Sequence, residues 1–132
     1  MSKIYLDVCI VIYFVEKHPD YAAAIEARIN GLSETDTLCF SPLIKMECLV
    51  MPLRTKDTVL QGRFEAFFHE QKMLALYEQR FDEAARLRAD FSSLKTPDAL
   101  HLAVAIHHKC DEFWTNDSRL SAVAPLLVKN IL

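Results

Sequence analysis

Short apolar runs alternate along the chain with longer segments in which apolar residues recur at helical spacing. Residues 4–6 form the first such run, which is typical of a buried strand, and residues 9–16 are expected to form a helix after it. The same alternation predicts further strands at residues 37–40, 73–77, 111–115 and 126–128. Because strands alternating with helices favour a parallel sheet covered on both faces, we expect a three-layer α/β/α sandwich around a mostly parallel sheet of about four to five strands.

Prolines and hydroxyl residues predict where two of the helices begin and end. Ser41 and Pro42 suit the N-cap and the first position of a helix, and Pro52 is expected to end that helix. Thr96 and Pro97 open a later helix that runs to about residue 108.

Composition narrows the class of protein. The 132 residues argue for a single domain spanning 1–132, and a hydrophobic fraction of 52% is enough for a proper core. With only two glycines, Gly-rich phosphate loops are nearly excluded. The sequence has no apolar run long enough for a membrane span and no leader pattern before the first strand, so we expect a cytoplasmic protein with no membrane contact. The four cysteines fit no zinc spacing and are expected to be free thiols.

Four acidic residues stand out because their neighbours are apolar. Asp7 and Asp117 each follow a predicted strand, so both are expected at the edge of the sheet where the carboxyl ends of parallel strands meet. Glu47 shares a helical face with two apolar residues and lies too deep in its helix to cap it. Asp98 lies in a first helical turn but shares a face with Leu102.

Each of these acids also has a simpler interpretation. Asp7 and Asp117 can serve as helix caps or turn residues, and Asp98 suits the positive end of a helix dipole. Glu47 can lie at the edge of its apolar face or pair with a buried arginine. Taken together, four acids in apolar surroundings favour a shared role over four separate ones.

A cluster of carboxylates requires a compensating positive charge. Two carboxylates about 5 Å apart repel by ~3 kcal/mol at an effective dielectric near 20, so either some of them are protonated or a cation lies between them. Ligands that are all oxygen suit Mg²⁺ or Mn²⁺, and such an ion can activate a water and stabilise a phosphate oxyanion. Carboxylates with a hard metal and no nucleophile point to phosphodiester hydrolysis.

At these positions the sequence resembles a PIN domain, and in particular a VapC-type toxin ribonuclease. The matching pieces are Tyr5-Leu6-Asp7, Ser41 with Glu47, the stretch from Thr96 to Ala103, and Thr115-Asn116-Asp117. The resemblance implies that Asp7, Glu47, Asp98 and Asp117 bind the metal and that the hydroxyl of Thr115 supports them. It also implies metal-dependent cleavage of RNA by a metal-activated water, a homodimer, and an antitoxin protein as partner.

The sequence departs from that family directly after Asp7. The family usually has Thr or Ser there, followed by Asn or Ser, whereas this chain has Val8 and Cys9. A polar group that would orient the attacking water is therefore missing on this side. Ser41, Thr115 and Asn116 are the positions where a replacement contact is expected.

Basic residues for RNA contact are predicted only locally, because the net charge is −3. Arg54, Lys56 and Arg63 form one candidate phosphate patch, with a solvated face as the alternative. His101 lies one turn after Asp98, where it is expected at the edge of the helix or in contact with phosphate.

The sequence therefore predicts a metal-dependent endoribonuclease of the toxin type. The alternatives are a PIN nuclease that processes RNA without toxicity, and a degenerate module that binds RNA or a partner without cutting.

Besides the family resemblance, the apolar pattern of one helix also predicts a homodimer. On so small a chain, we expect the apolar helical face with Leu60, Phe64 and Phe68 to exceed what one core can bury.

Overall fold

All five strands of the protein lie parallel in one sheet. The computed structural model describes residues 1–132, and the strand order is β3-β2-β1-β4-β5. The strands are β1 (Lys3–Leu6), β2 (Thr37–Phe40), β3 (Lys72–Met73), β4 (Glu112–Thr115) and β5 (Val128–Asn130). Each adjacent pair is parallel, as expected for strands joined by helical crossovers. The predicted α/β fold with a parallel sheet is confirmed.

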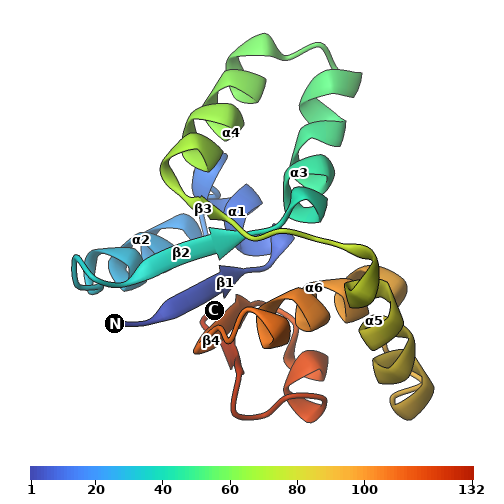
Figure 1. The fold of residues 1–132 in the computed structure, drawn as a ribbon. Coiled ribbons are helices and arrows are strands. Elements are labelled where there is room, and N and C mark those ends of the chain that lie inside the picture. Colours follow the sequence, from blue (N-terminus) through green and yellow to red (C-terminus); the bar gives the residue numbers. More distant parts are fainter.

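Helices cover the sheet on both faces (Figure 1). They are α1 (Val8–Val15), α2 (Ala22–Asn30), α3 (Pro42–Arg54), α4 (Thr58–Glu70), α5 (Glu78–Asp90) and α6 (Thr96–His107), and a 3₁₀ helix η1 (Ser118–Ala122) follows β4. The connections from β1 to β2 and from β2 to β3 both cross toward the β3 edge of the sheet. The connection from β3 to β4 crosses in the opposite direction. Right-handed crossovers therefore put α1–α4 on one face and α5 and α6 on the other.

The order of the strands creates a switch point beside the central strand. The chain leaves β1 toward β2, whereas it leaves β4, on the other side of β1, toward β5. Ligands of open parallel sheets bind where the strand order reverses in this way, outside the carboxyl ends of the two strands. Asp7 directly follows β1, and Asp117 lies two residues beyond β4.

The core is built around β1 and α6. Ile4, Tyr5 and Leu6 are almost completely buried, and so is every residue of α6 from Ala99 to Ala105. A helix that is apolar all round is buried, which explains why α6 shows no clear polar face.

The apolar face of α4 packs into this core and leaves no exposed apolar surface at Phe64 or Phe68. Phe64 and Phe68 are 0% and 4% exposed. The prediction that they form a dimer surface is therefore wrong, because the α4 face packs within its own chain. Fully burying one such side chain stabilises a fold by about 1.5–3 kcal/mol.

Three predicted boundaries differ from the structure by two residues or more. Pro52 does not end α3, which continues to Arg54, because a proline in the last turn forfeits only one hydrogen bond and its ring is buried here. The predicted strand at 73–77 is shortened to Lys72–Met73, because its only neighbour, β2, ends at Phe40. The last strand lies two residues later than predicted and pairs with β4 from Val128 onward.

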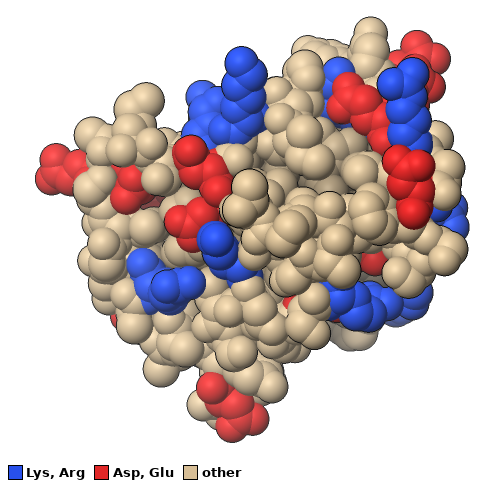
Figure 2. All heavy atoms as spheres, turned by 90° about the horizontal axis from the view of Figure 1, so that it is seen from below, with Lys and Arg blue, Asp and Glu red and all other residues tan.

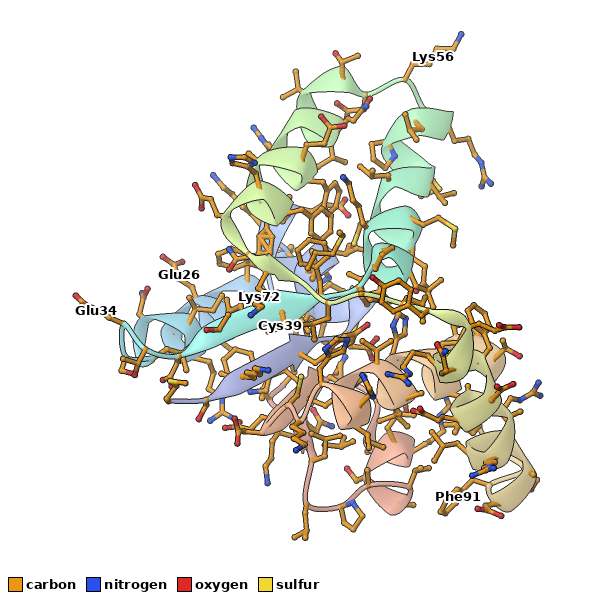
Figure 3. The ribbon with its side chains drawn as sticks, viewed as in Figure 1. Glu26, Glu34, Cys39, Lys56, Lys72 and Phe91 are labelled. Carbon is orange, nitrogen blue, oxygen red and sulfur yellow. The ribbon has the colours of Figure 1, made fainter.

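All four cysteines are free, as predicted. Cys39, which Figure 3 labels on β2, is buried together with Cys48, and the other two are half-buried. None of the helices is both long and apolar enough to cross a membrane.

Candidate active site

Asp7 caps a helix and at the same time joins two strands. Its Oδ1 accepts a hydrogen bond from the backbone N–H of Val8 at 2.8 Å, at the N-cap of α1. Its Oδ2 accepts one from the hydroxyl of Thr115 at 2.7 Å, at the end of β4. The capping interpretation of Asp7 is therefore correct but incomplete, because the carboxylate is also held across the switch point.

The surroundings of Asp7 disfavour its charge. The residue is only 8% exposed, and burial raises the pKa of its carboxyl above the ordinary value. The hydrogen bond from Thr115 lowers this pKa again, as do nearby His101 and the Val8 amide, while the charge of Asp98 raises it. A buried carboxylate with a second carboxylate within electrostatic reach favours a cation or a proton beside it.

Thr115 connects Asp7 to the loop that follows β4. Its hydroxyl donates to Asp7 and accepts a hydrogen bond from the backbone N–H of Asp117 at 3.0 Å, and the residue is completely buried. The hydroxyl therefore occupies the position where the sequence predicts a supporting contact. Asn116, between the two, is half-buried.

The carboxylate of Asp117 is engaged by an arginine. Asp117 is the N-cap of η1 and accepts from the backbone N–H of Arg119 at 3.0 Å, as its simpler interpretation predicts. The guanidinium of Arg119 also donates from Nε to Oδ1 at 2.9 Å. This arginine holds the pKa of the Asp117 carboxyl below its ordinary value.

Asp98 is the least constrained of the four acids. It is half-buried in the first turn of α6, and its carboxylate has no hydrogen bond or ion pair with another residue. Its charge raises the pKa of Asp7 and also that of Arg119, so it faces the same edge of the sheet as Asp7 and the η1 turn.

Glu47 pairs with a histidine and not with an arginine. Nε2 of His101 lies 2.7 Å from Oε1 of Glu47, and Nδ1 lies 2.8 Å from the hydroxyl of Tyr5. His101 is only 2% exposed. Both predicted alternatives for His101 are therefore wrong: the ring does not lie at an exposed helix edge, and a ring this deeply buried cannot contact the phosphate of RNA.

The four acids gather at one edge of the sheet without forming a closed ligand shell. No three side chains of the types His, Cys, Asp and Glu lie close enough together to hold a metal ion between them. In this arrangement Asp117 is paired with Arg119, and one oxygen of Glu47 is paired with His101.

The basic residues predicted to bind RNA are exposed but do not gather at the acids. Lys56 lies at the tip of the α3–α4 hairpin and points away from the sheet (Figure 3), and Arg54 is exposed in the last turn of α3. Arg63 lines a hollow of about 1020 Å³ between α1, α2 and α4, which contains none of the four acids. On the face drawn in Figure 2, acidic and basic side chains are interspersed and form no broad basic surface.

Tyr5 and Arg119 contact the candidate site residues but are not among the residues predicted from the sequence. Tyr5 connects His101 to Ser41, because its hydroxyl lies 2.8 Å from the Ser41 hydroxyl and 2.8 Å from His101 Nδ1. The hydroxyl of Ser41 makes no hydrogen bond to any of the acids. A tyrosine inside a buried strand needs a partner for its hydroxyl, and this was the available signal. Arg119 lies two residues after Asp117, and its role could be inferred only from the turn geometry.

Comparison with known proteins assigns a family to this arrangement. The family model described as PIN domain matches residues 4–126. Among solved structures, VapBC2 from Rickettsia felis bound to a promoter DNA fragment has a TM-score of 0.82 at 18% identity, covering 97% of this chain and 98% of that one. A toxin–antitoxin complex from Klebsiella pneumoniae has a TM-score of 0.77 at 19% identity, covering 98% of each chain.

A third similar structure is VapC20 from Mycobacterium tuberculosis, described as a toxin that cleaves the sarcin–ricin loop. It has a TM-score of 0.77 at 11% identity, covering 92% of this chain and 95% of that one. No curated protein sequence matches the chain. At these identities the structural likeness establishes the shared fold, and the family model covers nearly the whole chain. The chain therefore belongs to the PIN domain family.

Proposed function

We propose that this protein is a metal-dependent endoribonuclease of the VapC toxin type, acting as a single domain over residues 1–132. The observation that carries the proposal is the buried carboxylate of Asp7 at the switch point, within electrostatic reach of Asp98. Membership of the PIN domain family and likeness to toxin–antitoxin structures support the same function.

The available donors fit Mg²⁺ or Mn²⁺. Asp7, Asp98, Asp117 and Glu47 offer only oxygen atoms, the ligand type that these hard ions prefer. Asp98 has no protein partner, and Asp7 accepts only one hydrogen bond on each carboxylate oxygen. We propose that Asp7 and Asp98 hold the ion directly, that Glu47 binds it through Oε2, and that Asp117 joins them when Arg119 moves away. When bound, the ion supplies an activated water and neutralises charge on the scissile phosphate.

The protein's own residues orient this chemistry. Thr115 fixes the Asp7 carboxylate from one side and the Val8 amide fixes it from the other, so its remaining lone pairs have a set direction. Arg119, once released from Asp117, can neutralise a phosphate oxygen of the RNA. The exposed Arg54, Lys56 and Arg63 remain proposed RNA contacts, through charge alone.

A degenerate module that binds without cutting is the second candidate. It is favoured by Val8 and Cys9, which offer no strong polar group next to Asp7. The thiol of Cys9 is a weak donor. Its pKa is raised to about 11, mainly by burial and to a smaller extent by the charge of Asp7. A PIN nuclease that processes RNA without toxicity has no specific observation in its favour.

An antitoxin and a second copy of the chain are the proposed protein partners. The hollow between α1, α2 and α4 offers a protein partner an apolar floor that includes Phe14, Ile29 and Phe67. Met46, Val50 and Leu53 are exposed at helical spacing on α3 and replace the α4 residues as the proposed dimer surface. A cytoplasmic location is part of the proposal because RNA is the substrate.

The proposal is tested by incubating the purified protein with RNA and determining the product ends. We expect cleavage with Mg²⁺ or Mn²⁺ that stops when the ion is chelated by EDTA. Binding of RNA without cleavage at any metal concentration would instead favour the degenerate module. Growth arrest on expression in a bacterium, lost in the Asp98→Asn variant, separates a toxin from a processing nuclease.

A further inference from the structure

A chain of hydrogen bonds runs from the core to Glu47. Ser41 Oγ lies 2.8 Å from the Tyr5 hydroxyl, the hydroxyl lies 2.8 Å from His101 Nδ1, and His101 Nε2 lies 2.7 Å from Glu47 Oε1. The four residues come from β1, α3, α6 and the residue before α3. Ser41, Tyr5 and His101 are almost completely buried, whereas the Glu47 side chain is 26% exposed.

The carboxylate of Glu47 determines the direction of the outermost hydrogen bond. A carboxylate only accepts hydrogen bonds, so Nε2 of His101 carries the proton that points to Glu47. When Nε2 carries the only ring proton, Nδ1 accepts from the Tyr5 hydroxyl and the Tyr5 oxygen accepts from Ser41; when the ring carries both protons, Nδ1 donates to Tyr5 and Tyr5 donates to Ser41. In both cases the polar side-chain atoms of Ser41, Tyr5 and His101 have partners, and Nε2 donates to Glu47.

We propose that His101 is a positioning residue that holds Glu47 for metal binding; this rests on the proposed function. Glu47 Oε1 is held by the ring, while Oε2 has no protein partner and is free to face the site. A glutamate has three rotatable bonds, and a short bond to a buried ring removes most of their freedom. Asp7 and Glu47 both act on Tyr5 through their charge, so the chain ends at the edge where the other acids lie.

An ordinary core histidine would be satisfied by any two partners and would have no effect on the metal site. The proposal differs because His101 acts through Glu47. Loss of its contact with Glu47 should weaken metal binding only while Glu47 is present. Removing a partner that orients a metal ligand typically costs 10–100-fold in metal affinity or activity.

Two amide substitutions separate the two contacts of the ring. His101→Asn places its amide at the level of Nδ1 and can keep the Tyr5 contact, while His101→Gln extends to the level of Nε2 and can reach Glu47. The measurement is Mn²⁺ affinity of the full chain by titration calorimetry, with circular dichroism to verify folding. We expect the Asn variant to bind Mn²⁺ about 10–100-fold more weakly, and the Gln variant to recover part of that loss.

The decisive comparison uses Glu47→Gln as the background. In that background His101→Asn should cause no further loss of Mn²⁺ affinity. An equal loss in both backgrounds, or no loss in a folded Asn variant, would overturn the role of His101 and leave the proposed function intact. A wild-type protein that binds no Mn²⁺ would overturn both. If the Asn variant does not fold, Tyr5→Phe removes the inner support of the ring, and unchanged Mn²⁺ affinity in that variant would refute the proposal.

Discussion

Replacing Thr115 with valine should destabilise the protein strongly, although the two side chains have nearly the same size. Valine has nearly the same shape as threonine, so packing in this completely buried position is preserved. The change removes a 2.7 Å hydrogen bond to the Asp7 carboxylate and leaves the backbone N–H of Asp117 without its acceptor. A hydrogen bond to a charged group contributes about 1.5–3 kcal/mol, and a buried unpaired donor costs about 1–3 kcal/mol.

The two losses together amount to about 2.5–6 kcal/mol. Since Asp117 is partly exposed and its N–H can find water, we expect the lower half of this range, about 2.5–4 kcal/mol. At this chain length the melting temperature should fall by at least about 6 °C. The assay is urea unfolding without metal at pH 7, with wild-type protein measured in parallel. Thr115→Ser is the matched control, because it keeps the hydroxyl and loses only a methyl group.

The destabilisation should also depend on pH. Burial raises the pKa of Asp7 in the folded protein above its value in the unfolded chain. The contribution of Asp7 to stability is therefore greatest below its unfolded pKa, and it is lost as pH rises through the raised pKa of the folded state. The Thr115 hydroxyl opposes that shift by stabilising the ionised form. The gap between wild type and Thr115→Val should therefore narrow as pH falls and Asp7 becomes protonated. A valine variant as stable as wild type at pH 7, or a gap that widens in acid, would refute this reasoning.

Three further outcomes follow from the same edge of the sheet and from the α3 surface. The double variant Val8→Thr with Cys9→Asn should cleave RNA faster at fixed Mg²⁺, because it adds polar groups beside Asp7. Urea unfolding verifies that the variant is as stable as wild type. A stable variant that cuts no faster would mean that Thr115 already supplies the missing polar contact. Arg119→Gln should tighten Mn²⁺ binding severalfold in calorimetry by freeing Asp117, and weaker binding would contradict this. Light scattering should show a dimer that Val50→Glu converts to about 15 kDa monomers, and a monomeric wild type would remove the dimer.

The sequence predicts the sheet well because its signals are local. Periodic apolar residues and the prolines before α3 and α6 are sufficient to locate most of the helices and strands. The third strand was predicted too long, because its length depends on where the neighbouring β2 ends. The burial of Phe64 and Phe68 could not be predicted either, since the amount of surface that a core buries depends on how all the elements pack.

The candidate site shows the same limit. Asp7 and Asp117 were expected at one edge because they follow parallel strands, and this needs no knowledge of side-chain contacts. The hydrogen-bond partners of the acids could not be predicted, because each partner lies far away in the sequence or depends on the geometry of a turn. His101 lies on a helix that is apolar on all sides, so no amphipathic pattern indicates which way its ring points. Its contact with Glu47 joins α6 to α3, which cover opposite faces of the sheet, so it depends on the complete fold.

The central claim is that the acids at this edge hold the ion that RNA cleavage needs, and Asp98→Asn tests it most directly. Asp98 has no hydrogen bond or ion pair to lose, and removing its charge relieves Asp7. The variant should therefore fold with an unchanged or slightly higher melting temperature in the absence of metal. RNA cleavage with Mg²⁺ or Mn²⁺ should fall by at least about 100-fold, the upper end of the loss seen when only a supporting residue is removed. Wild-type cleavage by a folded Asp98→Asn variant would contradict the claim.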